Sequence, residues 1–146
     1  MFKRALIVML VFFMMASVAS ARELQGVELP EKMKIDGKTV VLNGAGVRSV
    51  MFLKFYVGGL YLMDAETDED VVMSADEPMA IRLHLIDDVD QDTMKKACNN
   101  GFKSATDGNI EPIQPQIDKF LDCFSDPIKE GDIFDFKYEP GVGTKI

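Results

Sequence analysis

Short segments of alternating apolar residues, separated by turn dipeptides, limit the folds that this chain can adopt. Residues 33–35 and 39–42 flank Asp36-Gly37, a dipeptide typical of a tight β-hairpin turn. Residues 79–86 alternate apolar with polar side chains, and residues 134–138 repeat the pattern. Strands joined by tight turns pair antiparallel, so we expect an antiparallel sheet with one apolar face and one more polar, solvent-exposed face.

Residues 47–63 form the most distinctive stretch of this pattern. They are rich in β-branched, aromatic and aliphatic residues and predict one long strand, or two strands joined by a bend. Residues 43–46 predict a turn before it, and Gly58-Gly59 predicts a bulge or a close approach to the backbone. In a regular strand Arg48 and Tyr56 would share one face.

From Asp92 the apolar period becomes helical, which predicts a helix that ends at Asp107-Gly108. Pro115 fits the first turn of a second helix. Asp90, just before the first helix, is expected to cap it. Two adjacent helices would cover one face of the sheet, so the expected fold class is α+β.

Residues 1–21 have the three parts of a secretory signal peptide. Lys3 and Arg4 precede twelve apolar residues, and Ala19-Ser20-Ala21 provides a cleavage site after Ala21. The alternative is an uncleaved membrane anchor, although a spanning helix needs about 20 apolar residues. We therefore expect an exported, periplasmic protein, a mature domain of residues 22–146, and no stable membrane insertion after cleavage.

Charge narrows the choice of partners. Cleavage would remove two of the 16 basic residues and none of the 24 acidic ones, which takes the formal charge from −8 to −10. The chain has no basic surplus to neutralise phosphates, so nucleic acid is excluded as a partner. The same overall charge argues against docking on an anionic lipid surface.

Cys98 and Cys123 are the two cysteines of the chain. In an oxidising compartment they could form a disulfide, and the alternative is two buried free thiols. Two cysteines and the single, distant His84 are too few ligands for a typical four-coordinate zinc site, so we expect no metal site.

Two blocks of sequence resemble the chalcone isomerase family, in particular its exported bacterial branch. The first is Asn43-Gly44-Ala45-Gly46-Val47-Arg48 with residues 54–62, and the second comprises residues 117–120, 129–132 and 138–144. The resemblance implies an open-faced β-sandwich, a curved antiparallel sheet with helices on one face and a cleft between them. Members usually continue with a further strand and helix, so a C-terminally truncated domain is expected.

The resemblance also implies roles for two residues. In chalcone isomerases the arginine that matches Arg48 faces the substrate oxyanion, whereas an enzyme tyrosine and asparagine fall at Asp90 and Ala97 here. Most of the polar catalytic set is therefore absent. A tyrosine at position 56 looks more like the fatty-acid-binding relatives, in which arginine and tyrosine hold a carboxylate.

Three functions follow as expectations, none of them with a cofactor. The first is an exported, non-catalytic protein that binds a small anionic amphiphile such as a fatty acid through Arg48 and Tyr56. The second is an intramolecular lyase of the chalcone isomerase type, an isomerase in which Arg48 would be the catalytic residue. The third is an envelope interaction module without a ligand. On that interpretation Arg48 is a strand-edge arginine paired with a nearby acidic residue, and Tyr56 packs against its cross-strand neighbours in the sheet.

Overall fold

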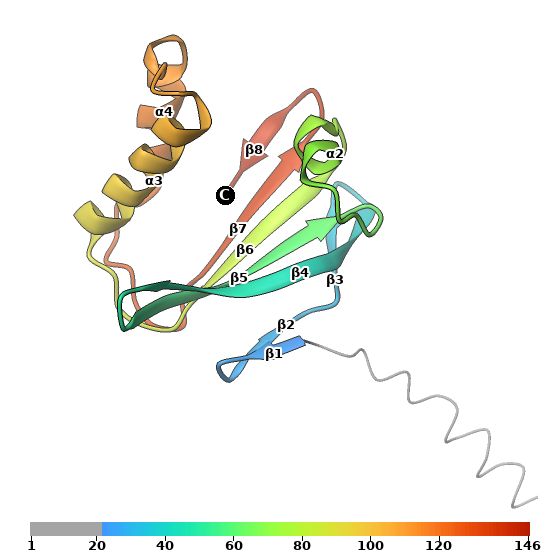
Figure 1. The fold of residues 1–146 in the computed structure, drawn as a ribbon, viewed down its shortest axis with the longest axis horizontal. Helices are drawn as coiled ribbons and strands as arrows, with labels where there is room; N and C mark the ends of the chain where they lie inside the picture. The colour runs from blue at the N-terminus through green and yellow to red at the C-terminus, as the bar shows by residue number, and fades with distance from the viewer. Residues whose placement is uncertain (1–21) are drawn as a thin grey trace, which may run out of the picture.

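The computed structural model describes residues 22–146, so the expected signal peptide lies outside the described residues. A six-stranded sheet, a separate two-stranded hairpin and three α-helices make up this part of the chain (Figure 1). In chain order the elements are β1 (Arg22–Leu24), β2 (Val27–Leu29), β3 (Lys32–Ile35), β4 (Lys38–Val50), β5 (Leu53–Leu62), α2 (Glu69–Ser74), β6 (Met79–Leu85), α3 (Gln91–Ala105), a 3-10 turn (Glu111–Ile113), α4 (Gln114–Leu121), β7 (Ile133–Glu139) and β8 (Gly143–Lys145).

The large sheet is a curled antiparallel meander. Its strands lie in the order β3-β4-β5-β6-β7-β8, so every strand pairs with its neighbours along the chain. Helices α3 and α4 lie on one side of the sheet and the β1–β2 hairpin lies on the other (Figure 1). The expected α+β class and the open-faced, curved sheet with helices on one face are confirmed.

The two faces of the sheet bury different cores. On the helix face, Leu85 packs with Met94 and Phe124 of the helical segment, and Tyr56, Leu83, Phe134 and Phe136 pack against this cluster. On the hairpin face, Val57 packs with Val27 and Leu29, while Tyr61 packs with Met33, Ile35, Val40 and Ala80. Alternation along β5 and β6 therefore supplies both cores, as their period of two requires.

The β4–β5 hairpin departs from the expectation for residues 43–63. Asn43–Gly46 lie inside β4 and not in a turn, and the chain reverses at Met51-Phe52 between β4 and β5. The register shifts fall between Leu42 and Gly44 and between Arg48 and Ser49, so no bulge occurs at Gly58-Gly59. The glycines of residues 43–46 resemble turn residues locally, but pairing with β5 holds them in a strand.

Gly58-Gly59 instead meets the second expectation, a close approach to the backbone. A Cβ built on Gly59 would lie 3.1 Å from Leu29 Cδ1 and 3.2 Å from both Leu42 Cδ1 and Tyr61 Cε2. A Cβ on Gly58 would meet its nearest atom, Tyr56 Cε2, at an ordinary 3.6 Å. The hairpin face therefore packs directly on the bare Cα of Gly59.

We expect Gly59→Ala to lower the free energy of unfolding by about 1–3 kcal/mol, because the added methyl overpacks this core. Gly58→Ala is the matched control and should be neutral or stabilising by up to about 1 kcal/mol, since alanine loses less backbone entropy than glycine. Urea unfolding of the two variants measures the difference. Equal effects of the two substitutions would show that the packing on Gly59 is not tight.

The helical layer is anchored by caps and by two connecting loops. The Asp90 side chain accepts a hydrogen bond from the Thr93 amide, which confirms the expected cap of α3, and Pro115 lies in the first turn of α4. The loop after β6 and the loop before β7 run side by side, joined by a Val89–Ile128 bridge. Both ends of the α3–α4 segment thus leave the sheet at one place.

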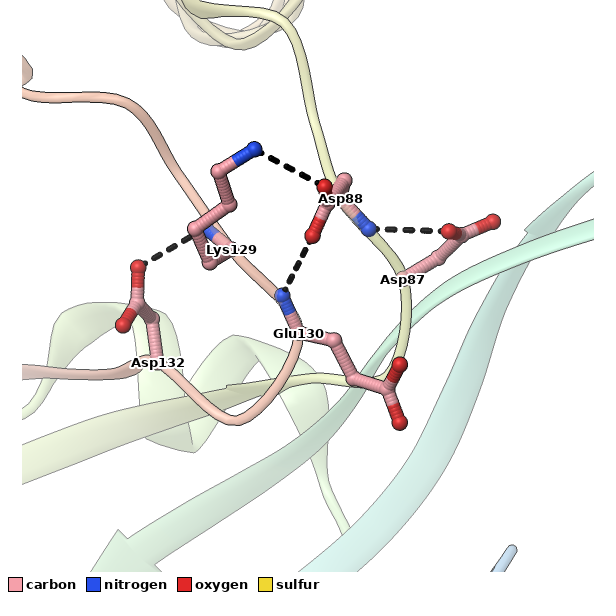
Figure 2. A network of polar contacts seen from close by, with 5 residues as sticks. All are labelled: Asp87, Asp88, Lys129, Glu130 and Asp132. Carbon is pink, nitrogen blue, oxygen red and sulfur yellow. Dashed lines mark hydrogen bonds and ion pairs between the residues drawn. The ribbon is translucent and has the colours of Figure 1, made fainter.

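Hydrogen bonds and an ion pair among Asp88, Lys129, Glu130 and Asp132 join these two loops, and we call the four residues the polar clamp (Figure 2). The Asp88 carboxylate accepts hydrogen bonds from the Glu130 amide at 3.0 Å and from Lys129 Nζ at 2.9 Å, and the Asp132 carboxylate accepts from the Lys129 amide at 2.8 Å. The amide of Glu130, followed by Lys129, lowers the pKa of Asp88, so the clamp contains a carboxylate at neutral pH. The clamp joins the two loops that connect the helical layer to the sheet.

Candidate functional site

Arg48 and Tyr56 are brought together by the β4–β5 hairpin. They are direct partners in the antiparallel register, and such partners have Cβ atoms about 5 Å apart on the same face. A regular strand would place the two residues on one face of a single strand, whereas the structure places them side by side on two strands. Tyr56 packs against the helix-face cluster, so both residues belong to the helix face.

Beyond this pair, glycines remove the side chains from part of the helix face. Gly46 pairs with Gly58, and Gly44 pairs with Leu60. A Cβ built on Gly44 or Gly46 would meet nothing within 4 Å, and the Tyr56 ring lies over the third glycine, Gly58. We call Gly44, Gly46 and Gly58 the glycine floor. Gly44, at its far end, lies about 13 Å from Arg48 along β4.

Apolar side chains border the glycine floor and are only partly covered. Leu60 pairs with Ile81, which pairs with Phe136, so the three form one row across the helix face. Phe120 covers the Phe136 end, with ring centroids 5.6 Å apart, whereas Ile81 in the middle of the sheet remains 46% exposed. The helix face therefore combines a covered half with an open apolar half beside the glycine floor.

Arg48 is exposed in the structure, at the end of the helix face where it pairs with Tyr56. The ion pairs within residues 22–146 join Arg82 to Asp135, Lys129 to Asp88 and Lys145 to Glu139, and Arg48 takes part in none of them. Its guanidinium is thus a cation at the end of an open apolar surface. The glycine floor was not predicted from the sequence, although Gly44 and Gly46 are spaced two residues apart, as on one face of a strand.

Cys98 and Cys123 are free cysteines in the structure, which gives no support to a disulfide between them. Cys98 packs against the helix-face cluster, and burial raises the pKa of its thiol. Cys123 is exposed and its Sγ lies 3.6 Å from the carbonyl of Lys119. The two cysteines are thus neither disulfide-bonded nor both buried, because Cys98 is partly buried and Cys123 is exposed.

Groups that could bind a metal are dispersed in the part of the chain that the structure describes. Nowhere in residues 22–146 do three His, Cys, Asp or Glu side chains gather in a way that could hold a metal ion. Within the same residues, none of the helices has the length and apolar character needed to cross a membrane.

An open curled sheet with a helical layer over one half of it defines the class of this chain. The profile of the chalcone isomerase-like family matches residues 21–146. The chain therefore belongs to the chalcone isomerase-like family.

Among solved structures the fold is similar to that of a fatty-acid binding protein from Arabidopsis thaliana. The two share 17% sequence identity with a TM-score of 0.61, over 84% of this chain and 73% of the other. No curated protein matches the sequence significantly.

Proposed function

We propose that this protein is an exported, non-catalytic member of its family that binds a small anionic amphiphile such as a fatty acid. The observation that carries the proposal is the pairing of Arg48 with Tyr56 at one end of an open apolar sheet face. A guanidinium presents forked donors to a carboxylate, and a phenol hydroxyl adds one more. The glycine floor and the Leu60–Ile81–Phe136 row would accommodate the hydrocarbon chain.

Two further observations support this assignment. Most small-molecule sites combine apolar walls with a few polar anchors, and the helix face has this composition. A structural neighbour with the same fold is a fatty-acid binding protein. Export is proposed on the leader-like pattern of residues 1–21.

Arg48→Gln is expected to weaken the binding of dodecanoate by about tenfold or more, because a hydrogen bond to a charged group contributes about 1.5–3 kcal/mol. The affinity for dodecan-1-ol should change little, since the alcohol has the same chain without the anion. Isothermal titration calorimetry on the full chain, below the aggregation limit of each ligand, measures both constants. Native mass spectrometry would identify any co-purified lipid.

Lys34→Gln is the matched control for the loss of one positive charge. Lys34 is an exposed cation whose partner Thr39 precedes Arg48 by nine residues of β4, roughly 30 Å along the strand. This variant should bind dodecanoate as the parent does. Equal losses in the two variants would mean that only net charge matters, and undetectable binding of dodecanoate to the parent would overturn the proposal.

A further inference from the structure

The turn of the β4–β5 hairpin exposes an uninterrupted group of apolar side chains. Val50 is 47% exposed, Met51 91%, Phe52 99% and Leu53 59%, and we call these four residues the apolar tip. The tip lies at the periphery of the molecule, where the chain reverses between β4 and β5 (Figure 1). Contiguous exposed apolar surface of this kind marks an interaction site.

The turn itself is built from residues that a hairpin does not favour. Met51 has a φ of 56°, a left-handed conformation that two-residue hairpin turns usually give to glycine or asparagine. A polar Asn-Gly turn would close the same hairpin with less strain and better hydration. The Met-Phe turn is thus less favourable for the hairpin than a polar turn would be, which points to a contact made by the tip.

The β4–β5 hairpin that carries the tip differs in the sign of its charge from the whole chain. Residues 37–63 contain Lys38, Arg48 and Lys54 and no aspartate or glutamate, although the chain has 24 acidic residues. Arg48 and Lys54 flank the apolar tip, and both are exposed. Charges farther away than about 8–10 Å are screened at physiological salt, so only nearby groups act on the tip. Arg48 and Lys54 are the charged residues of the hairpin beside it, and the acidic Asp87-Asp88 loop follows Ile86, whose amide donates a hydrogen bond to the Phe55 carbonyl.

We propose that the apolar tip inserts into the surface of a phospholipid bilayer, with Arg48 and Lys54 at the level of anionic headgroups. A fluid bilayer accepts a small apolar projection without a complementary surface, whereas a stable protein interface needs about 800 Å² from each partner. The apolar tip has only four residues, so its size is that of a small projection and not of a stable protein interface. The net negative charge of the whole chain disfavours binding to anionic lipid, but the β4–β5 hairpin itself contains only basic charged residues. Arg48 also belongs to the proposed ligand site, so the bilayer is tested through the apolar tip and Lys54 alone.

The chain has no tryptophan, so Phe52→Trp places a single fluorescent reporter in the tip. With vesicles of phosphatidylcholine and phosphatidylglycerol we expect a blue shift of its emission and quenching by lipids brominated along their chains. Met73→Trp is the matched control, because Met73 in α2 is 81% exposed and lies outside the tip. Its emission should not respond to vesicles.

Two further variants test the parts of the tip in vesicle co-sedimentation of the full chain. Phe52→Asp should weaken binding about tenfold or more, since it removes a large apolar side chain from the membrane. Lys54→Glu should weaken binding to vesicles with phosphatidylglycerol at least about fivefold, and have a smaller effect with phosphatidylcholine alone. Neither residue is buried, so both variants should fold.

Unchanged emission of Phe52→Trp on adding vesicles would overturn the proposal. So would a blue shift that grows with protein concentration in the absence of lipid, because the tip would then contact a second copy of the chain. A shift that requires vesicles, is quenched from the acyl chains and is absent in Met73→Trp supports bilayer insertion.

Discussion

Phe124→Ala is expected to lower the free energy of unfolding by about 3–5 kcal/mol, the usual loss when a buried phenylalanine becomes alanine. Phe124 is 2% exposed, and its ring lies 5.7 Å from that of Phe120 and 5.4 Å from that of Phe134 in β7. It thus joins the helical segment to the helix face. Since small domains are stable by about 5–15 kcal/mol, this single change would remove a large part of the total.

Urea unfolding followed by circular dichroism measures the loss for Phe124→Ala. Phe52→Ala is the control, because Phe52 is 99% exposed and its truncation should change stability by less than about 0.5 kcal/mol. If Phe124→Ala cost less than about 1 kcal/mol, the helical layer would not be packed on the sheet as described. A variant with two separate transitions would show that the layer unfolds on its own.

The success of local patterns explains why much of this fold could be predicted. Asp36-Gly37 forms the expected turn, with φ angles of 45° and 77°, because the dipeptide suits left-handed conformations. The alternation of residues 79–86 produces β6, with Leu83 and Leu85 in the helix-face cluster. Asp90 caps α3 through its own side chain. Each of these features depends on residues close together in the chain.

Features that depend on distant pairing were predicted poorly. Residues 43–46 have the composition of a turn, yet pairing with β5 and the two hydrogen bonds between the Asn43 side chain and the Glu66 backbone keep them extended. Met51-Phe52 has no turn signal and nevertheless reverses the chain. The register of two long strands, together with the helices packed on them, outweighs local preference at these positions.

In the candidate site, too, local features could be predicted and features that depend on distant packing could not. Its residue types could be predicted, since Arg48 and Tyr56 lie on one face of one hairpin. The exposure of Arg48 could not, because it depends on how far the α3–α4 layer extends over the sheet. Packing of Phe120 and Phe124 on β7 covers one half of the helix face and leaves Ile81 open. That extent is a property of the whole domain and not of the strand.

Asp135→Ala should cause the second large loss, about 2–4 kcal/mol, somewhat below the usual figure for a fully buried ion pair. Arg82 Nε and Nη2 each lie 2.7 Å from an oxygen of Asp135, and the side chains are only 20% and 23% exposed. The two residues are register partners on β6 and β7, on the hairpin face with Tyr61. Removing the carboxylate would leave a largely buried guanidinium without its anion beside an apolar core.

The double variant Arg82→Met/Asp135→Leu tests this explanation, since apolar replacement of both partners leaves no buried charge. It should be more stable than Asp135→Ala, and the two single substitutions Arg82→Met and Asp135→Leu should together cost more than the double variant. Urea unfolding of the four proteins in this cycle and of Asp135→Ala measures the coupling. Additive losses would mean that the pair is only a solvated surface contact. A strong coupling would instead show that the charge pair stabilises the contact between β6 and β7, the strand that also carries Phe134 and Phe136.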